Sequence, residues 1–213
     1  MIKIQNLKKA YKDCVALDTV SMHIRKGEFV AIIGASGSGK TTMLNIIGGL
    51  DTDYMGSCVV RNKEMSSLSD VECCTLRSRY ISYVYQFFNL ISFLTVKENV
   101  CLASQIKGKK VDAKELNQVL KLLGLEHKKD CFANELSGGQ QQRVAMARAI
   151  LAHTDIILAD EPTGNLDGEN AKNVMDILKA LNKEGKTIVL VTHDLKIANY
   201  ADRIIRLEQG KIV

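Results

Sequence analysis

Short apolar runs, each the length of a buried strand, alternate along the chain with segments of helical periodicity. The runs predict strands at residues 29–33, 81–84, 156–159, 187–191 and 204–207. A helix is expected from Lys40 until Gly48 and Gly49 stop it, and another at residues 170–184, which Gly185 ends. Strand, helix and strand at this spacing predict a parallel α/β sheet.

The stretch from about residue 90 to 152 breaks this alternation and is predicted to be helical throughout. Asp112 and Glu115 have capping-box spacing before one apolar stripe, and Ser137 and Gln140 have the same spacing before a second. We interpret this stretch as a helical lobe inserted into the α/β core. The first 28 residues alternate in the manner of strands, which favours a small additional antiparallel sheet.

The overall composition is that of an ordinary globular domain. The 213 residues suit a single domain, of which 46% are apolar and 25% charged. We expect residues 1–88 and 154–213 to form the core of this domain and residues 89–153 to form its helical subdomain. The net charge of +5 comes from scattered lysines and arginines, so no nucleic-acid partner is predicted.

Membrane and redox signals are weak along the whole chain. No apolar run approaches the roughly 18 residues that a membrane span needs, and the first residues lack a secretory signal. The six cysteines show no CxxC spacing. Without a secretory signal, these cysteines are expected to be reduced thiols in the cytoplasm.

The first chemical motif directly follows the strand at residues 29–33 and opens the helix at Lys40. Its spacing is G-x-x-x-x-G-K-[ST], in which glycines let successive N–H groups point into one concavity, beside the positive end of the helix. Lys40 is expected to reach the β- and γ-phosphates of a nucleotide, and Thr41 to offer its hydroxyl to Mg²⁺. The predicted binding residues are Gly34, Ala35, Ser36, Gly37, Ser38, Gly39, Lys40, Thr41 and Thr42.

The second motif is a pair of carboxylates that ends the strand at residues 156–159. In an α/β sheet, ligands bind at the carboxyl ends of the strands, where Asp160 is expected to hold Mg²⁺ directly or through water. Glu161 would then lie beside the γ-phosphate, where a carboxylate can act as general base on an attacking water. The structural alternative is a strand end with two acidic caps.

The third motif opens a helix inside the helical lobe. Its residues are Ser137, Gly138, Gly139 and Gln140. A serine and two glycines at a helix N-terminus form a second anion site, although a flexible cap is the alternative. Because this site lies in the lobe and not in the core, two chains that face each other head to tail are expected to sandwich the nucleotide between them.

Taken together, these motifs resemble those of an ATP-binding cassette (ABC) ATPase over nearly the whole chain. The resemblance implies an α/β phosphate-loop NTPase core with a small antiparallel β subdomain and an inserted α-helical subdomain. Residues 136–140, extending to Arg143, match the signature motif that faces the ATP of the partner subunit. ATP and Mg²⁺ are the implied ligands.

The resemblance assigns four more residues, each with a structural alternative. Tyr11 matches the aromatic residue that stacks on adenine, and the structural alternative is simple packing of an edge strand. Gln86 matches the catalytic glutamine that senses the γ-phosphate, contacts Mg²⁺ and links to the permease. The structural alternative is that Gln86 is an ordinary surface amide. Asp167 matches a dimer contact near the nucleotide, and it also suits a helix cap. His193 matches the switch histidine that holds Glu161 and water in line, and the structural alternative is an ordinary histidine at a strand end.

Within the family, residues 48–50, 83–99 and 135–149 resemble the lipoprotein-release, macrolide-efflux and antimicrobial-peptide-resistance exporters. This resemblance implies an ATP-hydrolysing homodimer that powers a membrane permease from the cytoplasmic face and exports or extracts a lipoprotein, peptide or antibiotic. Ser92 stands where a proline is common in this group, in a region expected to touch the permease. One alternative is an ATPase that regulates cell-wall hydrolases through a permease-like partner. A soluble DNA-repair or translation ATPase is another.

Overall fold

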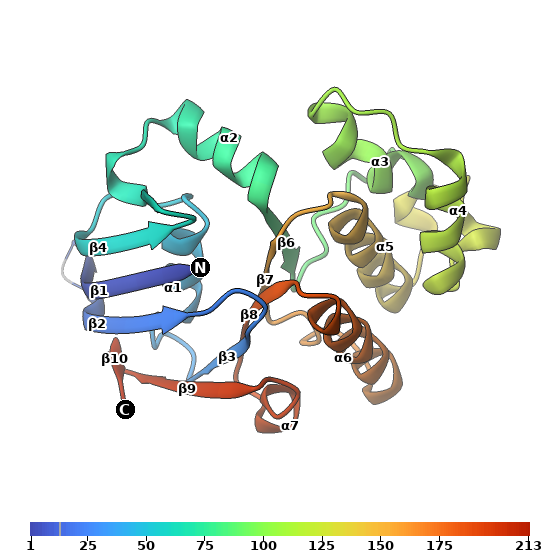
Figure 1. The fold of residues 1–213 in the computed structure, drawn as a ribbon. Helices are drawn as coiled ribbons and strands as arrows, with labels where there is room; N and C mark the ends of the chain where they lie inside the picture. The colour runs from blue at the N-terminus through green and yellow to red at the C-terminus, as the bar shows by residue number, and fades with distance from the viewer. Residues whose placement is uncertain (13) are drawn as a thin grey trace.

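A six-stranded sheet forms the centre of the computed structural model, which describes residues 1–12 and 14–213 (Figure 1). Its strands β3, β8, β7, β6 and β9 are parallel, and β10 pairs antiparallel with β9 at the edge. In sheet order, the strands are β10 (Lys211–Ile212), β9 (Arg203–Glu208), β3 (Phe29–Ile33), β8 (Thr187–Thr192), β7 (Ile156–Asp160) and β6 (Ile81–Tyr85). All five strands predicted from the apolar runs are confirmed.

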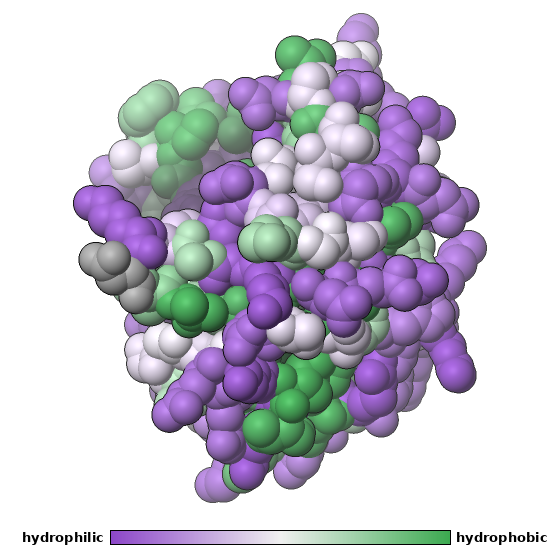
Figure 2. Space-filling view, turned by 90° about the vertical axis from the view of Figure 1, so that its left-hand side faces the viewer, coloured by the Kyte–Doolittle hydropathy of each residue, from purple (hydrophilic) through white to green (hydrophobic). Residues whose placement is uncertain are grey.

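A second, four-stranded antiparallel sheet lies beside the first, at the left of Figure 1. Its order is β2 (Cys14–Ile24), β1 (Ile2–Tyr11), β4 (Met55–Val60) and β5 (Lys63–Glu64). The sheet predicted from the first 28 residues is therefore confirmed, although the sequence patterns did not predict β4 and β5. The face of the molecule on this side is largely hydrophilic, with separate hydrophobic patches (Figure 2).

The helices divide between the two ends of the molecule. Helices α3, α4 and α5 gather at the end opposite the antiparallel sheet, with α6 beside them (Figure 1). The helices are α1 (Lys40–Ile47), α2 (Asp70–Tyr80), α3 (Val96–Ile106), α4 (Ala113–Leu122), α5 (Gly138–Leu151), α6 (Gly168–Lys183) and the short α7 (Leu195–Ala198), with 3-10 turns at Met65–Ser67, Glu126–Lys128 and Ala133–Glu135. None of the helices that the structure describes has the length and apolar character to cross a membrane.

Two hydrophobic cores lie on opposite faces of the six-stranded sheet. Successive side chains of a strand point to opposite faces, so alternate residues of β3 join different cores. Phe29, Ala31 and Ile33 pack with helices α3 to α6. Val30 and Ile32 pack with α1 and the antiparallel sheet. The sheet thus supports both the helical end and the antiparallel end of the molecule.

Two predictions about the helical stretch are wrong in detail. Residues 90–152 are not helical throughout, because Gly108 and Gly124 adopt left-handed φ values of 67° and 64° just after α3 and α4. Asp112 does cap α4 by accepting from the Lys114 amide, but no capping box forms. The carboxylate of Glu115 lies 2.8 Å from Nε2 of His153 instead.

Candidate functional site

A cavity of ≈ 820 Å³ opens where the phosphate-binding motif meets the carboxyl ends of the central strands. The ends of β6, β7 and β8 contribute to its walls, and Tyr11 contributes from the end of β1. The lining residues are Tyr11, Cys14, Ala16, Ala35, Ser36, Gly37, Gly39, Lys40, Thr41, Thr42, Tyr85, Gln86, Phe87, Asn89, Asp160, Glu161 and His193. The structure therefore brings residues from most of the predicted motifs to one place.

The phosphate-binding loop can fold only because glycine occupies its tight positions. A Cβ on Gly34 would come within 2.2 Å of the Leu207 carbonyl oxygen, and a Cβ on Gly39 would come equally close, 2.2 Å, to that of Ala16. Gly39 also has a φ of 100°, which side chains rarely tolerate. Gly34 and Ser38 are not among the residues that line the cavity, and the other seven predicted residues line it.

Lys40 is held under the loop, at the start of α1. Its buried ammonium donates to the carbonyl oxygens of Gly34 and Ala35, each at 2.8 Å. Gly39 occupies the N-cap of α1 and supplies no side-chain cap, so the N–H groups of the first turn point towards the cavity without a side-chain acceptor from that residue. A helix N-terminus with a lysine beside it is suited to binding phosphate.

Thr41 and Asp160 bring two oxygen atoms together at the floor of the cavity. The hydroxyl of Thr41 donates to Oδ1 of Asp160 across 3.4 Å. Burial raises the pKa of Asp160, and the neighbouring Glu161 carboxylate raises it further. A bound cation would oppose both effects. A hydroxyl and a carboxylate are hard oxygen ligands of the kind that Mg²⁺ prefers, so these residues fit a magnesium site.

Glu161 is oriented by the end of β8. Its Oε1 lies 2.8 Å from Nδ1 of His193, and its Oε2 accepts from the hydroxyl of Thr192 at 3.2 Å. The backbone N–H of Glu161 donates to the Val191 carbonyl at 2.9 Å, and the residue adopts a left-handed φ of 46°. Three contacts therefore fix a carboxylate beside Asp160 at the edge of the cavity.

Gln86 and Tyr11 form the outer walls. Gln86 is tied to the loop after β7, because its carbonyl accepts from Nδ2 of Asn165 at 3.0 Å and its Nε2 lies 3.4 Å from Oδ1 of the same residue. Tyr11 is nearly half exposed, and its hydroxyl donates to Asp51 at 2.7 Å. Both side chains can touch a ligand in the cavity.

The third motif and Asp167 lie apart from this cavity. Within residues 1–12 and 14–213, none of Ser137, Gly138, Gly139, Gln140 or Asp167 lines it. The Ser137 hydroxyl and the Gln140 side chain form the predicted capping box of α5. Asp167 caps α6 by accepting from the amide of residue 170 at 2.9 Å. The structural alternative for Asp167 is thus present, and its role in a dimer contact stays a prediction.

Several residues that shape the site were missed because no motif marks them. Lys9 and Asp51 hold Tyr11, and Thr192 holds Glu161. Arg148 binds the backbone that follows Gln86, through the carbonyl oxygens of residues 88 and 89. All of these contacts join segments that are distant in sequence or lie on different elements, so periodicity and spacing carry no signal for them.

Comparison with known proteins agrees with this geometry. A family model described as ABC transporter matches residues 17–164. The chain is 49% identical over 215 residues to the macrolide export ATP-binding/permease protein MacB of Campylobacter jejuni subsp. jejuni, covering all of this chain and 34% of that protein. It is 45% identical over 223 residues to the ABC transporter ATP-binding protein MJ0796 of Methanocaldococcus jannaschii, covering all of this chain and 95% of that one.

Solved structures match equally well. A dimeric structure of the cassette MJ0796 superposes with a TM-score of 0.91 at 45% identity, covering all of this chain and 96% of that chain. A dimeric post-hydrolysis structure of the same cassette, bound to ADP and Pi, also gives a TM-score of 0.91, at 43% identity over the same coverage. The chain spans about a third of the length of the macrolide-export relatives and nearly all of MJ0796. From the family match over residues 17–164 and this full-length relative, the chain belongs to the ABC transporter family as an ABC ATPase domain.

Proposed function

We propose that this chain is the ATP-hydrolysing subunit of an ABC transporter and powers a membrane permease from the cytoplasmic face. The observation that carries the proposal is the meeting of Lys40, Thr41, Asp160, Glu161 and His193 around one cavity. A phosphate-binding loop, a cation site and an oriented carboxylate are the parts that hydrolysis of a nucleoside triphosphate requires.

Each of these residues has a distinct role in the proposal. The loop amides and Lys40 bind the phosphates of ATP, and Thr41, Asp160 and Gln86 hold Mg²⁺. When bound, Mg²⁺ neutralises negative charge on the phosphate oxygens. Glu161 accepts a proton from the attacking water, and its bond of 2.8 Å to His193 keeps the carboxylate in position. Mispositioning by about 1 Å can cost a hundredfold in rate, which explains why three contacts fix Glu161.

The complete site needs a second copy of the chain. Ser137 to Gln140 form an anion-binding helix start that lies outside the cavity of their own chain. In the proposed homodimer, these residues and Asp167 contact the ATP held by the partner. The dimeric structures of MJ0796, at 43% and 45% identity, support a homodimer.

The permease is proposed to bind beside Gln86. Here a shallow groove of ≈ 380 Å³ runs between α2, β6, α3 and α5, and Tyr85 and Asn89 line both this groove and the nucleotide cavity. Ile106 of this groove and Phe87 and Phe93 of the segment that follows Gln86 are each about three-quarters exposed. Exposed apolar side chains beside a site are the kind of surface that docks another protein. The macrolide-export relatives, whose names combine an ATP-binding part with a permease, favour an exported antibiotic, and the resemblance of the sequence extends the proposal to a lipoprotein or peptide.

Phosphate release by the purified chain with Mg²⁺ and ATP tests the enzymatic part. Glu161→Gln should keep ATP binding and lower turnover by at least about a hundredfold, because a general base contributes roughly 10²–10⁴-fold. Glu184→Gln changes an exposed glutamate at the far end of α6 and serves as the matched control. Turnover of Glu161→Gln near that of the control would remove Glu161 as the base.

Sedimentation with membranes of the native host tests the partner. The double variant Phe93→Asp and Ile106→Asp should lose membrane association while the soluble protein still hydrolyses ATP. Leu122→Asp alters an equally apolar residue, 69% exposed on α4, and should remain bound. If the double variant sediments as fully as Leu122→Asp, the permease does not bind at this groove.

A further inference from the structure

The side chains of Tyr11, Lys9 and Asp51 all contact one another. Oδ2 of Asp51 accepts from the Tyr11 hydroxyl at 2.7 Å, and Oδ1 of the same carboxylate accepts from the Lys9 ammonium at 2.9 Å. The Lys9 ammonium also lies 4.7 Å from the centre of the Tyr11 ring, within the range of a cation–π contact. Each member of the set therefore restricts the other two.

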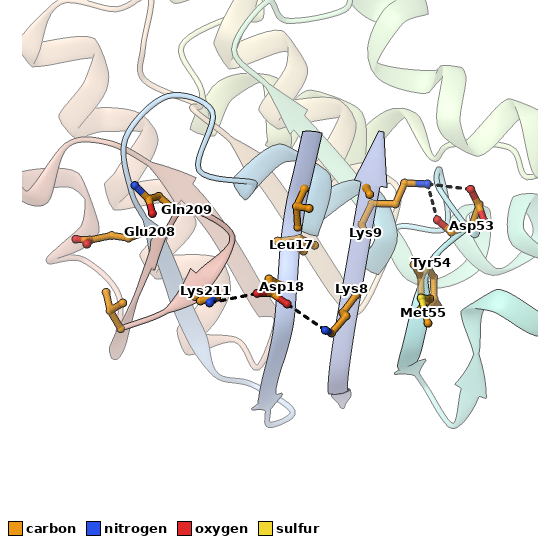
Figure 3. Close-up of a pocket in the computed structure, with 13 residues that line it drawn as sticks. Lys8, Lys9, Leu17, Asp18, Asp53, Tyr54, Met55, Glu208, Gln209 and Lys211 are labelled. Carbon is orange, nitrogen blue, oxygen red and sulfur yellow. Dashed lines mark hydrogen bonds and ion pairs between the residues drawn. The ribbon is translucent and has the colours of Figure 1, made fainter. Parts of the chain in front are cut away.

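Burial makes this set rigid. Lys9 is only 6% exposed, which is unusual for a lysine, and a buried ammonium must be paired to be tolerated. Figure 3 shows its side chain reaching from β1 to the loop at Asp53, whose backbone carbonyl and carboxylate also accept from it. Burial favours a raised pKa for Asp51, but hydrogen bonds from Tyr11 and Lys9 outweigh that effect and lower the pKa. Asp51 is thus a carboxylate that both neighbours can bind at neutral pH.

Tyr11 and Lys9 line two different hollows. Tyr11 lines the nucleotide cavity, and Lys9 is not among the residues that line it. Lys9 instead lines a neighbouring groove of ≈ 870 Å³, drawn in Figure 3, which Tyr11 does not line. The ammonium therefore covers the ring on the side away from the cavity, and the side towards the cavity stays open.

We propose that Lys9 and Asp51 are positioning residues that fix the Tyr11 ring as a platform for the adenine base. The inference rests on the proposed function, because it needs ATP in the cavity. An exposed aromatic side chain normally loses rotational freedom when a ligand stacks on it, and that ordering lowers affinity. Here the hydroxyl is anchored to Asp51 and one face is covered by Lys9, so the ring is ordered before the nucleotide binds.

The test compares two ligands that share the triphosphate but not the base. ATP and inorganic triphosphate are each bound with Mg²⁺ to the full chain, and KM and kcat are measured for ATP. In Asp51→Ala and Lys9→Met, the KM for ATP should rise about five- to tenfold, a part of what stacking of one base contributes. The kcat and the affinity for triphosphate should stay within about twofold, since neither substitution touches the phosphate loop.

Two further variants separate positioning from general damage. Lys8→Met changes the neighbouring lysine, which pairs with Asp18, and should leave both ligands unaffected. Tyr11→Phe keeps the ring but loses its anchor, so it should raise the KM for ATP as Asp51→Ala does. In the Tyr11→Phe background, Asp51→Ala should then add less than about twofold, because coupled residues are not additive.

Three results would overturn the inference. One is an unchanged KM for ATP in Asp51→Ala and Lys9→Met, and another is an equal loss of affinity for ATP and triphosphate. The third is a full effect of Asp51→Ala in the Tyr11→Phe background. A wild-type chain that neither binds nor hydrolyses ATP would instead refute the proposed function, so the two failures can be told apart.

Discussion

Arg148 joins α5 to the backbone bend that follows Gln86, and its loss should destabilise the protein measurably. Its Nη1 donates to the carbonyl of Asn89 at 2.7 Å and its Nη2 to that of Phe88 at 3.0 Å. Phe88 and Asn89 both adopt left-handed φ values, 58° and 47°. Such a conformation costs about 1–2 kcal/mol per residue, so the bend needs outside support.

Arg148→Met removes both donors and keeps an unbranched apolar stem of similar reach. Each hydrogen bond from a charged donor contributes about 1.5–3 kcal/mol, which gives about 3–6 kcal/mol for the two. Water can replace part of the exposed contact to Asn89, and burial lowers the pKa of Arg148, a sign that its charge is partly desolvated at a cost. Allowing for both effects, we expect the free energy of unfolding to fall by about 2 kcal/mol.

Urea unfolding followed by circular dichroism measures this loss. If the free energy of unfolding falls by about 3 kcal/mol per molar of urea, the urea concentration at the unfolding midpoint should fall by about 0.7 M. Arg143→Met is the matched control on the same helix, because Nε of Arg143 is buried without a hydrogen-bond partner among the described residues. A midpoint for Arg148→Met equal to that of the wild type, or to that of Arg143→Met, would refute the reasoning.

Three other substitutions give separable outcomes. His193→Ala should lower kcat about a hundredfold with little change in KM, because it releases Glu161 but leaves the phosphate loop intact. Steady-state kinetics measures both constants, and a raised KM with an unchanged kcat would contradict this role. Gly39→Ala should abolish ATP binding measured by calorimetry, since its Cβ would lie 2.2 Å from the Ala16 carbonyl, and retained affinity would contradict the steric argument. The pKa of Asp202 is lowered, chiefly by the hydrogen bond from Lys179, so it stabilises the fold above its unfolded pKa of about 3.9 and loses this effect as the pH falls further. The temperature of thermal unfolding of Asp202→Asn should therefore lie below that of the wild type at pH 7, and the gap should narrow as the pH falls below about 3.9, whereas a constant gap would exclude the linkage.

Strands β3, β7 and β8 of the central sheet were predictable because they are buried on both faces and read as continuous apolar runs. Strands β4 and β5 and helix α2 were not predicted. Helix α2 buries only Cys73 and Leu76, so its apolar periodicity is weak, although the capping box of Ser69 and Glu72 at its start was a usable signal. The same kind of signal misled at Glu115, whose carboxylate pairs with His153 across the fold.

The residues of the candidate site also divide into those that the sequence predicts and those that it does not. Residues in contiguous motifs, such as Lys40, Thr41 and Asp160, could be predicted because adjacent residues on one loop or strand end share a location. The supports for these residues, Lys9, Asp51 and Arg148, act through contacts between separate elements, which only the folded chain brings together. A motif therefore predicts which groups meet the ligand, and the fold is needed to see what holds them.

The mass of the Glu161→Gln variant in solution tests most directly the central claim that two chains complete each ATP site. With Mg²⁺ and ATP, light scattering should report twice the mass of one chain, and with ADP it should report a single chain. Adding Ser137→Arg should return the ATP-bound protein to the single-chain mass while ATP binding persists. A single-chain mass for Glu161→Gln at saturating ATP, or loss of ATP binding on adding Ser137→Arg, would contradict the account.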